Sequence, residues 1–155
     1  RYHHVMLGYN YRMTNFQAAI GLEQLKRLNY VISEKEKIAV KYNLSFSNCE
    51  GVKTPFVPDY VTQHAWYMYT ISVDQKSRDG IVERLADLNI QTRLSFPPVH
   101  TQPFYQKKFG YENDSLPESY GAWSKLINIP MWVGINEKQS YVIDKIKDVV
   151  NQIGT

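Results

Sequence analysis

The first clear hydrophobic pattern in the chain is helical and begins after residue 14. Apolar side chains recur three, four or seven positions apart on one side, at Ala18, Leu22, Leu25 and Ile32. Thr14 and Gln17 have the T-x-x-Q spacing of a capping box, in which side chains satisfy free backbone donors at a helix start. The pattern therefore predicts helix to about Phe46, as one long helix or as two with a bend near Asn29 or Ser33.

An alternating pattern follows and is typical of a strand. The segment 66–73, WYMYTISV, places aromatic and β-branched side chains on one side, namely Tyr67, Tyr69, Ile71 and Val73. After Ser77, the apolar spacing becomes helical again, at Ile81, Leu85 and Leu88. A second short strand is expected around IQTRL, residues 90–94. The order is thus strand, helix, strand.

The stretch 95–114, SFPPVHTQPFYQKKFGYEND, has three prolines and no period, which predicts a long loop. Ser115 and Glu118 then have the spacing of a second capping box, and LINIP predicts a brief strand. An apolar stripe predicts a last helix and consists of Val142, Ile146, Val149 and Ile153. Gly154 would end this helix. The expected fold class is α/β, a two-layer arrangement of helices on a small mixed sheet after a long helix.

Composition places the chain among ordinary globular proteins. Its 155 residues, 43% of them apolar, match one domain with a buried core. The net charge of +3 is small and the lysines are scattered over the predicted helix exteriors, so we expect no nucleic-acid partner. No apolar run has the length of a membrane span or of a signal-peptide core. With Cys49 as the single cysteine, we expect no membrane association and a cytoplasmic location.

Motifs that carry chemistry by themselves are missing from the sequence. The four histidines have no zinc-ligand spacing, so we expect no metal site. The glycines form no phosphate-binding loop. No serine stands in a nucleophile elbow, and Cys49 has no evident base beside it.

Several longer segments do resemble a known family. They are GYNYRMTNFQAAIGLEQL at 8–25, HAWYMYTISV at 64–73, TRLSFPPVHTQPFY at 92–105 with FGY soon after, and LPESYGAWSKLINIPMW at 116–132. In this order they resemble the DegT/DnrJ/EryC1/StrS family of pyridoxal-phosphate sugar aminotransferases, over nearly the whole chain. The segment 92–105 is most similar to the GDP-perosamine synthase-like members.

The resemblance implies the C-terminal portion of a fold-type-I aminotransferase, a homodimer whose active site is shared between subunits. Its cofactor is pyridoxal 5'-phosphate, which carries the chemistry. Its partners are a glutamate donor and a nucleotide-linked sugar, in the narrower form a GDP-linked 4-keto-6-deoxy sugar. The chain starts without Met, without a polar lead-in and without a first secondary element, so we expect a C-terminal fragment of a longer protein. We interpret residues 1–50 as an interface segment and long helix that link from a missing cofactor-binding domain. Residues 51–155 would form the C-terminal small α/β domain.

Four residues receive roles through the resemblance. Asn10 matches an asparagine that donates its amide to the cofactor phosphate in the neighbouring subunit; on the residues alone it is a turn residue. Arg12 is a candidate for the sugar-nucleotide phosphate, or else a surface ion pair. Arg93 is a candidate diphosphate or interface contact. His100 matches a histidine beside the substrate, whereas a lone loop histidine is usually just exposed.

The family's Schiff-base lysine and the Gly-rich turn after it are expected upstream of the matching segments. We assign no lysine of this chain to that role, and therefore expect this portion alone to be inactive in amino transfer. Two alternatives stay open. One is a sugar dehydratase of the same family, in which histidine replaces that lysine. The other is a non-catalytic ligand-binding or interaction domain.

Overall fold

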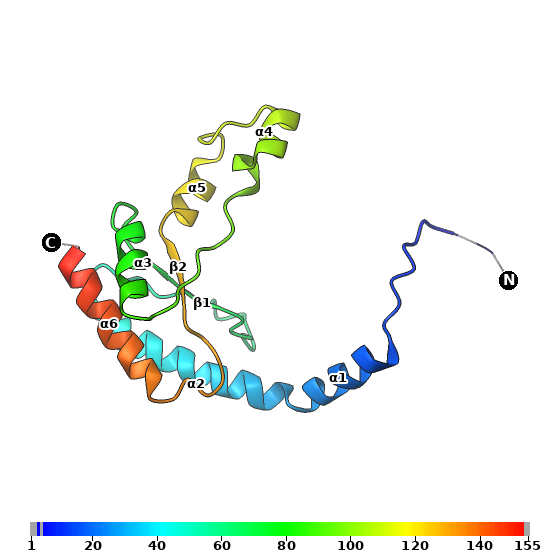
Figure 1. The fold of residues 1–155 in the computed structure, drawn as a ribbon, viewed down its shortest axis with the longest axis horizontal. Coiled ribbons are helices and arrows are strands. Elements are labelled where there is room, and N and C mark those ends of the chain that lie inside the picture. The colour runs from blue at the N-terminus through cyan, green and yellow to red at the C-terminus, as the bar shows by residue number, and fades with distance from the viewer. Residues whose placement is uncertain (1–2, 4, 154–155) are drawn as a thin grey trace.

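The computed structural model describes residues 3 and 5–153 and consists of a compact body with two projections. One projection is the N-terminal segment with helix α1 (Asn15–Lys26), which continues the line of helix α2 (Leu28–Phe46) away from the body (Figure 1). The other is an arm that carries helices α4 (Pro103–Phe109) and α5 (Pro117–Trp123). Both projections extend from the body, which contains both strands.

The predicted long helix is two helices. Thr14 caps α1: its Oγ1 accepts from the Gln17 backbone N–H at 3.3 Å, and the Gln17 Oε1 accepts from the Thr14 N–H at 2.9 Å. The predicted capping box is therefore confirmed. The break between the helices falls at Arg27, two residues before the first of the bend positions that the pattern indicated.

The sheet of the body is small and antiparallel. Strand β1 (Tyr69–Ser72) pairs with strand β2 (Leu126–Ile129), with Tyr69 opposite Ile129 and Ile71 opposite Ile127. Single bridges flank the pair, Lys53 to Ser72 on one side and Arg93 to Asn128 on the other. The strand expected around residues 90–94 is thus reduced to one bridge, and the one expected at 66–73 is shorter than predicted.

Three helices pack with this sheet around one core. They are α2, α3 (Arg78–Asp87) and α6 (Lys138–Ile153). The fully buried large side chains come from all three helices, both strands and one loop: Tyr42, Phe46, Tyr69, Ile71, Ile81, Leu85, Ile127, Ile135, Ile146 and Val149. The α/β class and the apolar stripe of the last helix are confirmed. Tyr42 and Phe46 lie in this core although they precede the predicted boundary at residue 50, and Gly154 lies outside the described residues.

The arm shows where the pattern was wrong. In place of a loop it contains a 3₁₀ turn, η1 (Val99–Thr101), and helix α4 (Pro103–Phe109), followed by α5 (Pro117–Trp123). α4 begins with a proline and ends at Gly110, whose φ of 72° is left-handed. The second capping box does not form, because the Ser115 hydroxyl accepts from the Glu112 N–H at 2.8 Å and α5 has no side-chain cap.

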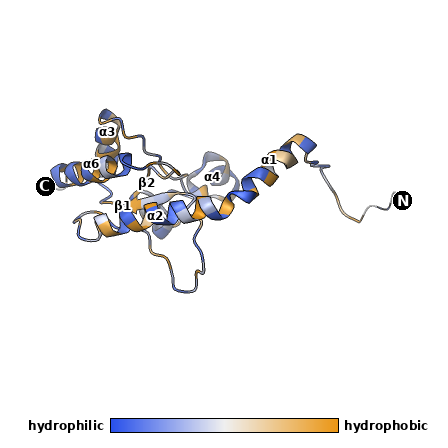
Figure 2. Ribbon diagram, turned by 90° about the horizontal axis from the view of Figure 1, so that it is seen from below, coloured by the Kyte–Doolittle hydropathy of each residue, from blue (hydrophilic) through white to orange (hydrophobic). Residues whose placement is uncertain are grey.

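Helix α1 has no core of its own. None of its residues is buried, and Phe16, Leu22 and Leu25 are 75%, 61% and 64% exposed. Figure 2 shows apolar positions along α1, while the sheet and helices α3 and α6 lie toward the opposite end of α2. Among the residues described, no helix combines the length and the apolar character that crossing a membrane requires.

Candidate functional site

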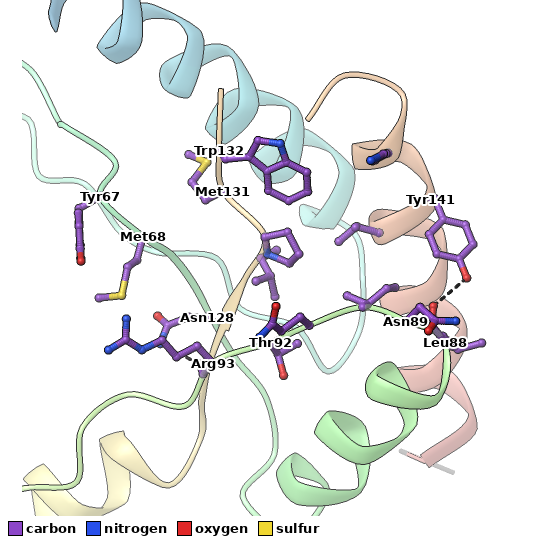
Figure 3. A pocket seen from close by; sticks show the side chains of 16 residues that line it. Tyr67, Met68, Leu88, Asn89, Thr92, Arg93, Asn128, Met131, Trp132 and Tyr141 are labelled. Atoms are coloured by element: carbon purple, nitrogen blue, oxygen red, sulfur yellow. Dashed lines mark hydrogen bonds between the residues drawn. The ribbon is translucent and has the colours of Figure 1, made fainter. Parts of the chain in front are cut away.

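A cavity of about 850 Å³ lies beside the sheet. Figure 3 shows it where three segments meet: the chain that follows α3, the end of β2 and the first turns of α6. It is lined by Tyr67, Met68, Leu88, Asn89, Ile90, Gln91, Thr92, Arg93, Asn128, Ile129, Pro130, Met131, Trp132, Lys138, Tyr141 and Val142. None of these is acidic, and two are cations.

The charged and aromatic groups of the cavity suit an anionic ligand with a planar ring. In Figure 3, Arg93 extends toward Tyr67 and Met68 at one end, and Trp132 lies nearer the middle. Lys138 contributes the second cation, from the first residue of α6. Guanidinium and ammonium groups bind phosphates through charge-assisted hydrogen bonds, and exposed aromatic faces offer stacking surfaces.

Hydroxyl groups hold the walls of this cavity in place. The buried Tyr42 hydroxyl donates to the Pro130 carbonyl oxygen at 2.8 Å, and the Tyr141 hydroxyl donates to the Leu88 carbonyl oxygen at 3.1 Å. Burial raises the pKa of the Tyr42 phenol well above its usual value, with a smaller contribution from Tyr69. The Tyr42 phenol therefore stays a neutral donor over the physiological pH range.

Trp66 lies next to the cavity wall in an unusual backbone conformation. Its φ is +47°, a region that a bulky residue rarely adopts. Its indole N–H donates to Glu36 at 2.5 Å, its backbone N–H donates to the His64 Nδ1 at 3.0 Å, and its carbonyl oxygen accepts from the Lys35 Nζ at 3.1 Å. Trp66 itself is buried in the core. Tyr67 is 75% exposed and reaches the cavity, although the alternating pattern placed it on the same side of the strand as the buried Tyr69 and Ile71.

Of the four residues that the resemblance selected, only Arg93 lines the cavity. Its guanidinium also lies over the Phe96 ring, 5.4 Å from the centroid. Asn10 and Arg12 are exposed in the segment before α1, and Figure 1 shows this segment far from β2 and α6, which contribute residues to the cavity. A single copy of the chain therefore does not bring them together with Arg93.

Asn10 lies in a short segment whose side chains point into open space. Its backbone is left-handed, with φ +57°, and the rings of Tyr9 and Tyr11 stack on each other 5.7 Å apart. An exposed amide on such a segment can donate to a phosphate held by another molecule. The local geometry is thus compatible with the role that the resemblance gave to Asn10.

His100 is buried inside the arm. It is 4% exposed, and its Nε2 lies 3.3 Å from the Asn113 carbonyl oxygen. Its ring also meets Tyr111 edge-on, with centroids 6.5 Å apart. In this structure His100 joins η1 to the turn after α4, and it does not line the cavity.

Lys138, Trp132 and Tyr141 were missed as cavity residues by sequence reasoning. Lys138 and Tyr141 stand in a helix whose pattern reveals only its core side, and Trp132 ends the quoted segment LINIPMW without any spacing that marks a site. Within residues 3 and 5–153, no three His, Cys, Asp or Glu side chains are grouped as metal ligands would be.

Comparison with known proteins identifies the family. Residues 1–147 match the model of the DegT/DnrJ/EryC1/StrS aminotransferase family, and the chain belongs to this family. The match begins before α1 and ends within α6, so it includes every residue that lines the cavity. The family predicted from the quoted motifs is therefore confirmed.

Individual relatives agree with this assignment. The chain is 36% identical to the spore coat polysaccharide biosynthesis protein SpsC of Bacillus subtilis, over 92% of the chain and 38% of SpsC. It is 35% identical to GDP-perosamine synthase of Escherichia coli O157:H7, over 96% of the chain and 39% of that protein. The chain thus spans about two fifths of the length of these relatives.

A solved structure shows the same fold. NtdA of Bacillus subtilis with bound cofactor PMP superposes with a TM-score of 0.79 at 25% identity, over 94% of this chain and 34% of that one. The α/β body therefore has the fold of one part of the NtdA chain.

Proposed function

We propose that this chain is the C-terminal portion of an aminotransferase that moves an amino group from glutamate to a keto carbon of a nucleotide-linked sugar. The observation that carries the proposal is the cavity beside β2, which combines Arg93 and Lys138 with aromatic side chains and no lining carboxylate. A nucleoside diphosphate has the matching chemistry, since it joins two negative phosphates to a planar base. The similarity to GDP-perosamine synthase supports a GDP-linked sugar as the narrower substrate.

The cavity gives a direct test of the nucleotide part. GDP is titrated into the chain and binding is measured by calorimetry, with wild type, Arg93→Ala and Arg84→Ala compared. Arg84 is the matched control because it is an exposed arginine on α3 that does not line the cavity. We expect Arg93→Ala to weaken GDP binding about tenfold, the loss of one charge-assisted contact, and Arg84→Ala to leave it within about twofold. Equal affinities for all three chains would exclude this cavity as the nucleotide site.

The cofactor in this proposal is pyridoxal 5'-phosphate, which supplies the electron sink for amino transfer when bound. This chain would contribute Asn10, whose exposed amide reaches the cofactor phosphate of a second subunit in a homodimer. Arg12, two residues further on, would meet the substrate phosphates in the same shared site. The fold shared with NtdA and its bound PMP supports this cofactor.

The lysine that carries the cofactor would then come from outside this chain. In a full-length enzyme, we expect Asn10→Ala to raise the dissociation constant for pyridoxal 5'-phosphate about tenfold. Asn48 is an exposed asparagine in the turn after α2, and we expect Asn48→Ala to leave this constant unchanged. Borohydride reduction followed by peptide mapping finds the modified lysine. A modified lysine within residues 1–155 contradicts this division of the site.

A further inference from the structure

Asn128 is a buried polar residue in the middle of the site that no motif singled out. It stands in β2, is 5% exposed, and all of its side-chain polar atoms are bonded. Its Oδ1 accepts from the Thr70 hydroxyl at 2.6 Å. Its Nδ2 donates to the Arg93 carbonyl oxygen at 2.9 Å and to the Ser95 Oγ at 3.2 Å. One amide therefore ties strand β1 to the segment 93–95.

This segment depends on the amide because little else holds it to the sheet. Arg93 and Asn128 exchange two backbone hydrogen bonds, at 3.0 and 2.9 Å, but they form a single bridge and not part of a longer ladder. A lone bridge at a sheet edge opens easily, since no neighbouring pair supports it. The Asn128 side chain adds a third hydrogen bond between Asn128 and Arg93, and it also donates a hydrogen bond to Ser95.

Ser95 also connects the body to the arm. Its carbonyl oxygen accepts from the Trp123 indole N–H at 2.9 Å, and the Arg78 guanidinium lies over the Trp123 ring, 5.3 Å from the centroid. A continuous set of contacts thus runs from α3 through Trp123 and Ser95 to Asn128. The direction in which the chain leaves the sheet toward the arm is set at this point.

From these contacts we propose that Asn128 is a positioning residue: its amide fixes the backbone at Arg93 and Ser95, and so holds the Arg93 guanidinium at the cavity for a phosphate-bearing ligand. The Asn128 side chain does not bind the ligand itself, because its donors and acceptor are already hydrogen-bonded within the protein. A long flexible arginine binds an anion more tightly when its backbone is fixed in advance.

Because this role rests on the proposed function, the test separates the two. GDP affinity is measured for wild type, Asn128→Leu, Arg93→Ala and the double variant. If Asn128 acts through Arg93, Asn128→Leu weakens GDP binding about fivefold in the wild type and by less than about twofold in the Arg93→Ala background. An equal effect in both backgrounds, or no effect in the wild type, overturns the role.

Gln139→Leu is the matched control, since Gln139 is 4% exposed and its amide donates to the Ile38 carbonyl oxygen at 2.8 Å, away from Arg93. This variant removes an amide that is as buried as that of Asn128, and we expect it to change GDP affinity by no more than about twofold. If both variants weaken binding alike, general loosening of the fold explains the result and the role is wrong. Should Asn128→Leu fail to fold, Asn128→Ser replaces it, because serine is small and polar.

Hydrogen exchange of the Arg93 backbone amide measures how often its hydrogen bond to Asn128 opens, and it needs no ligand. We expect its protection to fall about tenfold in Asn128→Leu and to stay unchanged in Gln139→Leu. If the wild-type chain binds no GDP, the proposed function of the cavity fails, and this exchange rate alone decides whether Asn128 fixes the segment. Unchanged protection in Asn128→Leu contradicts the role whatever GDP does.

Discussion

The hydroxyl of Tyr42 donates a 2.8 Å hydrogen bond to the carbonyl oxygen of Pro130, 88 residues further along the chain. Tyr42 is fully buried in α2, whereas Pro130 follows β2 and lines the cavity. The bond therefore joins the long helix to the wall of the site. It also satisfies a carbonyl group that the turn after β2 leaves without a strand partner.

Loss of this bond lowers stability. We expect Tyr42→Phe to decrease the free energy of unfolding by about 1–2 kcal/mol, because the Pro130 carbonyl stays desolvated without a donor. Tyr141→Phe is the control, since the Tyr141 hydroxyl bonds a carbonyl at an exposed site, and we expect a decrease below about 0.5 kcal/mol. Urea denaturation measures both. Equal losses in the two variants would contradict the special place of Tyr42.

Alkaline pH destabilises the fold through Tyr42 and Tyr69. Burial raises the pKa of both phenols above the ordinary value of 10.0, so the unfolded chain gives up these protons first. Their contribution is complete below pH 10 and is lost as pH rises further. We expect the free energy of unfolding to fall by about 1.4 kcal/mol per pH unit for each such group.

Replacing one phenol isolates this effect from the titration of other groups. Above pH 10, the free energy of unfolding of Tyr42→Phe is expected to decline less steeply than that of the wild type, by about 1.4 kcal/mol per pH unit. The measurement is urea denaturation at several pH values. Parallel curves for the two proteins would mean that Tyr42 ionises equally in the folded and unfolded chains.

Two glycines respond in opposite ways to alanine. Gly51 has a φ of +84°, and a Cβ there would lie 2.9 Å from the Val150 Cγ1. We expect Gly51→Ala to cost about 1–3 kcal/mol in the free energy of unfolding. Gly121 lies within α5, and a Cβ there would meet nothing within 4 Å, so Gly121→Ala is expected to raise the free energy of unfolding by up to about 1 kcal/mol. Thermal denaturation distinguishes the signs.

The Glu36 carboxylate supports Trp66. We expect Glu36→Ala to lower the free energy of unfolding by about 1 kcal/mol, because the indole N–H of a 3% exposed tryptophan loses its acceptor. Glu34→Ala on the same helix removes only an ion pair with the exposed Lys37, for which we expect a clearly smaller loss. Similar values for both variants would show that the indole finds water instead.

Local chemistry explains which parts of the fold were predictable. The start of α1 follows from Thr14 and Gln17 alone, because a capping box needs four neighbouring residues and no tertiary contact. The core faces of β1 and α6 follow from the spacing of their apolar residues. Helix α4 carried a readable signal too, Pro103 at its start and Gly110 after its end, but the other prolines nearby concealed it.

The site was less accessible to sequence reasoning because it is assembled from distant segments. Arg93 was selected only through the family resemblance, and no spacing connects it with Lys138, 45 positions later. Asn128 reads as one polar residue in an apolar strand, and its importance lies in three partners that only the folded chain supplies. His100 resembled a ligand-binding residue by its motif, yet here it is packed inside the arm.

Helix α1 has a capping box but no tertiary packing to stabilise it. It has 12 residues, an intact capping box and no buried side chain. A helix of that length has a marginal helix–coil equilibrium in water when tertiary packing does not support it. The far-ultraviolet ellipticity of the free chain will therefore fall short of what its full set of helical residues would give. We expect the magnitude of the ellipticity to rise when another surface covers Phe16, Leu22 and Leu25, so that it becomes a simple measure of assembly.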